Sequence, residues 1–163
     1  MSTRALYTFK GSEDSGSPHD FNVYKHHDGY PTGAAGVLNT TIKHFAWVLP
    51  RYESDAFAAA FCAAAKCEAL HLTDVLEGAP LEPILKDYAN YRQWQGGGVR
   101  LMPQGDPVEV AERNCSDIDY RYEIWFEDNN LQIKCFEFGN NTPIYSGPFN
   151  EFVTWAHERE DAA

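Results

Sequence analysis

The chain has 163 residues, of which 44% are hydrophobic and 14% aromatic, and 24 acidic against 13 basic side chains give a formal net charge of −11. This length suits one domain, residues 1–163, with a substantial core, and the composition excludes a disordered chain. No apolar run approaches the ~20 residues of a membrane span, and the negative charge disfavours direct nucleic-acid binding, which Lys and Arg normally drive.

The charge is uneven along the sequence. Residues 1–50 contain four acids and four bases, so the whole excess of −11 follows residue 50. The N-terminal third is therefore where an anionic ligand meets the least repulsion. The acidic remainder either serves solubility or imitates nucleic acid toward a nucleic-acid enzyme.

The sequence indicates a reducing compartment. Its start, Met-Ser-Thr-Arg, lacks the apolar stretch of a secretory signal, so we expect a cytoplasmic protein. The spacing of Cys62 and Cys67 matches neither a CxxC motif nor a helical metal pair. We expect four free thiols, no metal and no cofactor.

The first two predicted strands are residues 4–10 (RALYTFK) and 21–26 (FNVYKH), joined by a Gly/Ser/Pro-rich loop. Helical spacing predicts a helix over residues 32–45 with Thr32 as its cap. The alanine-rich residues 51–70 predict the most buried helix.

The middle of the chain is less regular. Residues 71–95 contain Pro80 and Pro83, and we expect an irregular insertion there. Residues 99–102 predict a short strand, and residues 104–116 predict an acidic loop.

A hairpin is the clearest pattern, with strands at residues 119–126 and 131–136 around a four-residue loop, 127–130. Pairing Phe126 with Leu131 places Glu123 opposite Lys134 on one face and apolar pairs on the other.

The C-terminal segment completes the predicted architecture. An edge strand at residues 142–145 precedes a last helix, which Ser146 caps and which carries Pro148 in its first turn. The predicted fold is α+β, a single domain with a mainly antiparallel sheet of five or six strands and three or four helices.

Residues 23–33 read VYKHHDGYPTG, with Asp-Gly-Tyr-Pro-x-Gly as their centre. This run resembles the signature of a group of small uncharacterised proteins that are widespread in phages and their bacterial hosts. The likeness extends in order to TRAL at 3–6, GGVRLMP at 97–103, DYRY at 119–122 and SGP at 146–148. Residues 68–95 depart most from the pattern. The resemblance implies no activity, but a phage setting favours proteins that interfere with host immunity.

The motif also has a physical reading. Asp28-Gly29 and Tyr30-Pro31 form turns, with Gly29 free to take positive φ, so the chain bends sharply from strand to helix. The start of that helix offers unpaired N–H groups, which suit a phosphate or carboxylate. Around this anion site lie the Lys25 ammonium, the imidazoles of His26 and His27, and the Tyr30 ring, which can stack on a ligand. The candidate ligand residues are Tyr24, Lys25, His27, Asp28, Gly29, Tyr30 and Gly33. Alternatively, the motif is only a rigid turn whose tyrosine packs on the sheet.

Two strand arginines, Arg100 and Arg121, are further candidates for ligand binding. The alternative is an ion pair with an acid such as Asp119. Metal binding by the adjacent His26 and His27 is disfavoured, because neighbouring strand residues point to opposite faces.

Three hypotheses follow. The first is a non-catalytic, phage-type protein that sequesters a small anionic, nucleotide-like ligand as a sponge and so counters host immunity. The second is an acidic inhibitor that docks on a host defence protein. The third is a small hydrolase or phosphodiesterase with His26 or His27 as general base beside Asp28 or Asp106. Each of the three hypotheses is compatible with a homo-oligomer, and none of them involves a membrane.

Overall fold

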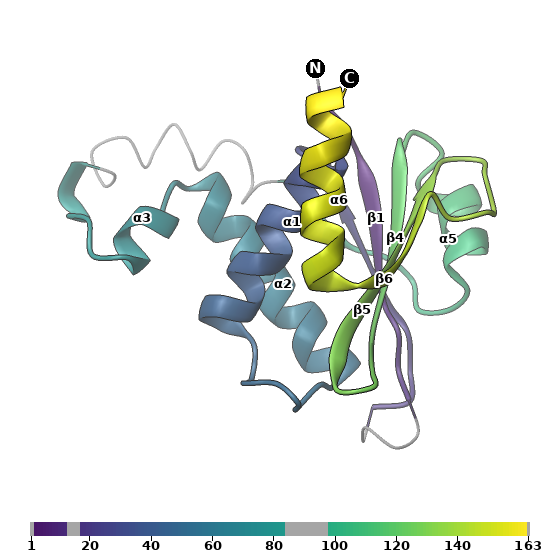
Figure 1. The fold of residues 1–163 in the computed structure, drawn as a ribbon, viewed down its shortest axis with the longest axis horizontal. Helices are drawn as coiled ribbons and strands as arrows, with labels where there is room; N and C mark the ends of the chain where they lie inside the picture. Colours follow the sequence, from purple (N-terminus) through teal and green to yellow (C-terminus); the bar gives the residue numbers. More distant parts are fainter. Residues whose placement is uncertain (1, 13–16, 84–97, 163) are drawn as a thin grey trace.

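In a computed structural model, residues 2–12, 17–83 and 98–162 are described, and they confirm the predicted α+β fold (Figure 1). The strands are β1 (Ala5–Phe9), β2 (Phe21–Lys25), β3 (Val99–Leu101), β4 (Tyr120–Glu127), β5 (Asn130–Glu137) and β6 (Tyr145–Pro148). The α-helices are α1 (Pro31–Thr40), α2 (Ser54–Ala69), α3 (Thr73–Leu76), α5 (Pro107–Asn114) and α6 (Phe149–Ala162). A π-helical turn, η2 (Thr41–Phe45), continues α1. None of the helices in these ranges is long and apolar enough to cross a membrane.

One sheet holds all six strands in the order β3-β2-β1-β4-β5-β6. Every neighbouring pair is antiparallel except β1 and β4, which run parallel from Ala5↔Tyr120 to Phe9↔Ile124. The N-terminal hairpin β1-β2 and the C-terminal meander β4-β5-β6 therefore meet at the centre of the sheet.

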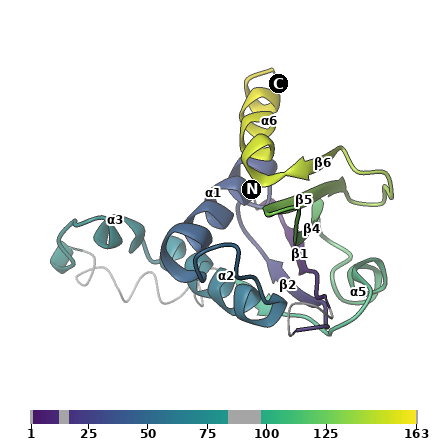
Figure 2. The ribbon, with the colours of Figure 1, turned by 60° about the horizontal axis from the view of Figure 1, so that its bottom comes forward.

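Helices cover the two faces of the sheet unequally. Among the described helices, Figure 2 shows α1, α2 and α6 on one face and α5 on the other. The larger core lies under the three helices and contains aromatic rings in contact with one another, among them Tyr7, Phe9, Phe61, Tyr122 and Phe152. A smaller core under α5 contains Leu6, Tyr24, Val110, Ala111, Cys115 and Ile118.

The predicted hairpin register is confirmed. Phe126 pairs with Leu131, Ile124 with Ile133, and Glu123 with Lys134. The predicted four-residue loop is wrong, because Glu127 pairs with Asn130 and only two residues turn the chain. These are Asp128 and Asn129, with φ of 53° and 61°. Asp and Asn tolerate this left-handed region, and such a turn matches the twist of the strands.

Residues 104–116, predicted as a loop, contain helix α5 instead. Asp106 caps it by accepting a hydrogen bond from the Glu109 N–H at 3.2 Å, and Pro107 occupies its first turn. Burial of Val110 and Ala111 against the sheet stabilises this short helix. The described residues therefore contain five α-helices, more than the three or four predicted.

The other differences are at element ends. The last strand is Tyr145–Pro148 rather than residues 142–145, so Ser146 and Pro148 belong to β6 and not to the start of α6. Helix α1 begins after Tyr30 and not after Thr32. Within residues 71–95, α3 lies in the first half, and residues 84–95 are outside the described part of the chain.

Candidate functional site

The Asp-Gly-Tyr-Pro turn is fixed against the central strands. The Gly29 N–H donates to the Thr3 carbonyl at 2.8 Å, and the Gly29 carbonyl accepts the Tyr122 hydroxyl at 2.7 Å. A Cβ on Gly29 would lie 2.8 Å from the Ala5 Cβ, so this position needs glycine for close approach. The expected positive φ falls on Asp28 instead, at 56°.

Gly33, three residues into α1, is also fixed by packing. A Cβ there would lie 2.1 Å from the Asp28 carbonyl oxygen. The turn and the first helical turn therefore touch backbone to backbone. This contact accounts for Gly33 without a ligand, and a role in ligand binding stays a prediction.

Lys25 supports the turn from the interior. Its side chain is on the face covered by α1 and α2, the residue is 5% exposed, and its Nζ donates to the His27 carbonyl. Burial lowers the pKa of this ammonium, while Asp28 and Glu68 oppose that shift. On α2, Glu68 accepts a hydrogen bond from the Thr40 hydroxyl at 3.1 Å, and burial raises its pKa. Lys25 therefore faces carboxylates and a carbonyl inside the protein.

Tyr24 and His26 belong to the opposite face. The Tyr24 hydroxyl and His26 Nδ1 are hydrogen-bonded at 2.7 Å, and Arg100, exposed on β3, pairs with Tyr24 across the strands. His27 Nδ1 lies 3.0 Å from the Ser2 hydroxyl, and burial lowers the pKa of its imidazole. The predicted ligand residues of β2 are thus divided between the two faces of the sheet.

Arg121 lies on the α5 side of β4, on the opposite face of the sheet from Tyr122, whose hydroxyl contacts the turn. It forms an ion pair with Glu123, lies 3.9 Å from the centre of the Phe136 ring and is 6% exposed. The alternative of an ion pair with an acid is therefore confirmed for Arg121, but the acid is Glu123. Asp119, named as an example, instead accepts the backbone N–H of Arg4 at 3.1 Å.

A cleft of about 550 Å³, here named the turn cleft, opens beside the motif. It lies where the start of α1 meets the end of α6 and the first residue of β4. Its lining residues are Tyr30, Pro31, Thr32, Tyr120, Ala156, Arg159, Glu160 and Ala162. Tyr30 is 39% exposed, and its hydroxyl donates to Asp28 Oδ1 at 3.3 Å. Burial, Asp28 and Glu160 raise the pKa of this phenol.

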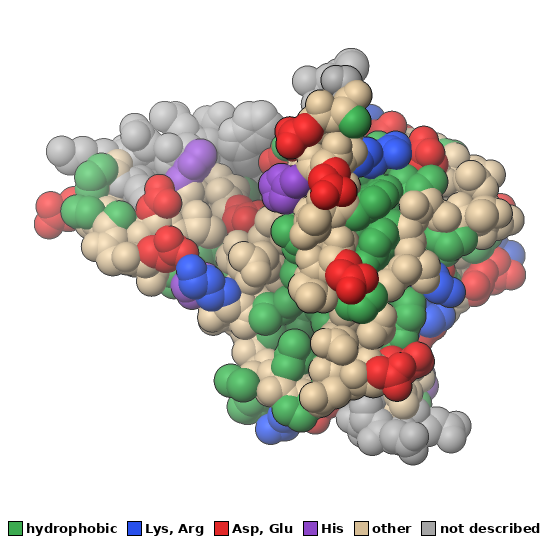
Figure 3. All heavy atoms as spheres, viewed as in Figure 1, with side chains coloured by type: hydrophobic (Ala, Val, Ile, Leu, Met, Phe, Trp, Pro, Cys, Tyr) green, Lys and Arg blue, Asp and Glu red, His purple; other side chains and the backbone are tan. Residues whose placement is uncertain are grey.

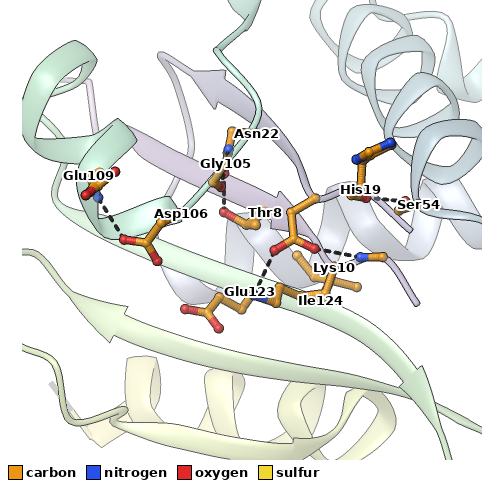
Figure 4. Close-up of polar contacts among 12 residues, drawn as sticks. Thr8, Lys10, His19, Asn22, Ser54, Gly105, Asp106, Glu109, Glu123 and Ile124 are labelled. Atoms are coloured by element: carbon orange, nitrogen blue, oxygen red, sulfur yellow. Dashed lines mark hydrogen bonds and ion pairs between the residues drawn. The ribbon is translucent and has the colours of Figure 1, made fainter. Parts of the chain in front are cut away.

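A second cleft of about 650 Å³, here named the hairpin cleft, lies at the other end of β4. Its lining residues are Lys10, Gly11, Ser12, Pro50, Tyr52, Glu123, Trp125, Phe126, Glu127 and Lys134. Figure 4 shows Lys10 next to Ile124, where the end of β1 meets β4. Lys10 is paired with Asp20 at 2.9 Å.

Metal-binding side chains are not gathered in either cleft. Across the described residues, no group of three or more His, Cys, Asp or Glu side chains could hold a metal ion. The four cysteines are free thiols. Burial raises the pKa of Cys135 to about 12 and that of Cys115 to about 11, so neither is a reactive thiolate at neutral pH.

Comparison with known proteins adds no relative: no family model, curated protein or solved structure matches this chain.

The sequence analysis does not single out two residues that line the clefts, Arg159 and Trp125. For Arg159 the sequence holds no signal, because only the packing of α6 beside α1 brings it to the motif. Trp125 could have been found, since the predicted register places it on the same face as Glu123 and Lys134.

Proposed function

We propose that this chain is a non-catalytic binding protein that captures a small anionic, nucleotide-derived ligand in the turn cleft. The observation that carries the proposal is that Tyr30 of the motif lines one cleft with Tyr120 and Arg159. The volume of about 550 Å³ lies in the range usual for small-molecule sites.

The lining suits a phosphate joined to a polar ring system. The Arg159 guanidinium can bind two phosphate oxygens at once. No side chain caps the first N–H groups of α1, so their partial positive charge supplements Arg159. Tyr30 and Tyr120 offer ring faces, and Glu160 can accept hydrogen bonds from sugar hydroxyls. One cation beside a carboxylate fits a single phosphate better than a polyphosphate.

In this proposal Lys25 is a positioning residue. It holds the His27 carbonyl from inside, at the start of the turn that presents Tyr30. Capture without turnover would remove a host immune signal, in keeping with the resemblance to phage proteins.

The acidic surface gives less support to the inhibitor hypothesis. On the face drawn in Figure 3, acidic side chains are dispersed over α3, over α6 and at the right-hand side of the view, and other residue types separate them. Docking by charge imitation needs a continuous carboxylate face, whereas the turn cleft is a formed concavity.

Calorimetric titration with a panel of cyclic and linear mononucleotides tests the proposal. Arg159→Gln removes the charge, and the matched control Arg113→Gln removes an exposed arginine from α5 on the opposite face. We expect Arg159→Gln to weaken binding about tenfold or more and Arg113→Gln to leave it unchanged. The proposal fails if no nucleotide gives heat with the unaltered protein, or if the two variants bind alike.

A further inference from the structure

The hairpin cleft exists because β1 and β4 separate. Their pairing ends at Phe9↔Ile124, and the Lys10 N–H then donates to the Ile124 carbonyl at 2.7 Å. Beyond this point β4 continues to Glu127, and β5 is its one neighbouring strand among the described residues. The Tyr52 hydroxyl closes the fork by donating to the Lys10 carbonyl at 3.1 Å and the Ile124 carbonyl at 3.3 Å.

The fork leaves one residue of β4 with a free backbone edge. Residues two apart in a strand direct their N–H and C=O groups to the same side. The Ile124 carbonyl points toward β1, so the N–H and C=O of Phe126 point the same way, where β1 has left the sheet. Within residues 2–12, 17–83 and 98–162, these two groups have no partner on that side. Phe126 also lines the cleft.

The charged groups of the cleft differ in how they are engaged. Lys10 is paired with Asp20, and Glu123 with Arg121. Lys134 has no ion pair among the described residues, and its Nζ lies 5.6 Å from the centre of the Trp125 ring. The cleft therefore offers an ammonium beside a partly exposed indole, next to a free backbone donor and acceptor.

We propose that the hairpin cleft is a second binding site, for a nucleoside monophosphate whose base has adjacent donor and acceptor groups, such as adenine. The base edge pairs with the N–H and C=O of Phe126, the ring packs against Trp125, and the phosphate binds Lys134. The site is separate from the turn cleft and does not depend on it.

A planar base fits this edge better than a peptide strand. Strand addition needs a row of free backbone groups, but here the Lys10 carbonyl is occupied by Tyr52 and β4 turns back after Glu127. Among the described residues at this edge, Phe126 alone offers both a free N–H and a free C=O. The volume of about 650 Å³ accommodates a nucleotide.

Titrations with AMP, adenosine and inorganic phosphate test the assignment. We expect Lys134→Gln to weaken AMP binding about tenfold or more and to leave adenosine binding unchanged. Trp125→Leu is expected to weaken both, whereas the control Lys66→Gln, an exposed lysine on α2, changes neither. In the unaltered protein, AMP is expected to shift the Phe126 amide resonance and slow its exchange with solvent.

The outcomes separate this site from the turn cleft. Suppose that AMP binds, that Arg159→Gln abolishes this binding and that Lys134→Gln does not. AMP then occupies the turn cleft, and the present assignment is wrong. If Lys134→Gln alone weakens binding, the hairpin site stands whatever the turn cleft holds. The assignment is also wrong if AMP does not bind, or if the resonance and exchange rate of the Phe126 amide do not change at saturating AMP. It is equally wrong if an extended peptide protects this amide from exchange and AMP does not.

Discussion

The turn cleft and the hairpin cleft lie at opposite ends of β4, and different features shape them. At the turn end, Gly29 is held through both its N–H and its carbonyl, at 2.8 and 2.7 Å. At the hairpin end, one hydroxyl of Tyr52 is shared between two carbonyls at 3.1 and 3.3 Å. A local motif with close backbone contacts forms the first cleft, and the parting of two strands forms the second. The turn end is therefore expected to be the more rigid.

If backbone contact fixes the turn end, Gly33→Ala will have the largest effect on stability. Its Cβ would meet the Asp28 carbonyl at 2.1 Å, and backbone cannot move away cheaply. We expect a loss of about 3 kcal/mol in the free energy of unfolding, measured with urea. The control is Gly36→Ala in the same helix, where a Cβ meets nothing within 4 Å. Alanine there is expected to stabilise by up to about 1 kcal/mol. Equal effects of the two changes would contradict the steric explanation.

Tyr122→Phe tests the hydroxyl that anchors Gly29. It leaves a buried carbonyl without its donor, and we expect a loss of about 2 kcal/mol. Its neighbour Tyr7, stacked at 5.0 Å and equally buried, is the matched control. The Tyr7 hydroxyl has no hydrogen-bond partner within the described ranges, so Tyr7→Phe is expected to be neutral or stabilising. Thermal unfolding of both variants decides the matter, and a larger loss for Tyr7→Phe would refute the anchoring role.

Tyr52→Phe examines the hairpin end by the same kind of change. Because the hydroxyl divides between two longer bonds, we expect a loss of about 1 kcal/mol or less. Amide exchange is expected to quicken near Lys10 and Ile124 and to stay unchanged near Gly29. A loss greater than that of Tyr122→Phe would reverse the proposed order of rigidity.

The smallest effect on stability is expected from the Glu68 carboxylate, the charge behind the turn. Burial raises the pKa of Glu68 above its ordinary 4.5, so the native state binds more protons than the unfolded state. The contribution of Glu68 to stability therefore falls as pH rises from about 4.5 through the raised pKa. Glu68→Gln removes that fall, so its gain over the unaltered protein grows across this window and vanishes below it.

Glu77→Gln is the control, because its effect on stability is expected to depend on pH in the opposite direction. Lys43 lowers the pKa of exposed Glu77, so this carboxylate stabilises the protein above its lowered pKa and the contribution is lost as pH falls. Urea unfolding of both variants at several pH values checks the pair. A Glu68→Gln gain that increases toward acid pH would contradict the burial explanation.

Local pattern predicted much of this fold and less of its sites. The alternation of apolar and polar residues was enough to predict the β4-β5 register, because the apolar pairs and the charged pair both require the same register. The same alternation on β2 could have predicted that Lys25 is buried, because Lys25 follows Phe21 and Val23 on the buried face. The acidic composition of residues 104–116 predicts a loop, although Asp106, Pro107 and Glu109 form the recognisable start of helix α5. The free edge of Phe126 depends on where β1 leaves β4, which no local pattern encodes.

The parallel pairing of β1 with β4 bears on how the nascent chain folds. Ala5 pairs with Tyr120, so the partner of β1 leaves the ribosome about 115 residues later. At roughly 5–20 residues per second this interval is on the order of 6–25 s. During that time one edge of β1, whose five residues are all buried in the finished fold, has no strand beside it. Such an apolar edge invites pairing between chains, so a fragment that ends before β4 is expected to aggregate, and synthesis of the full chain is expected to benefit from chaperones that cover exposed strands.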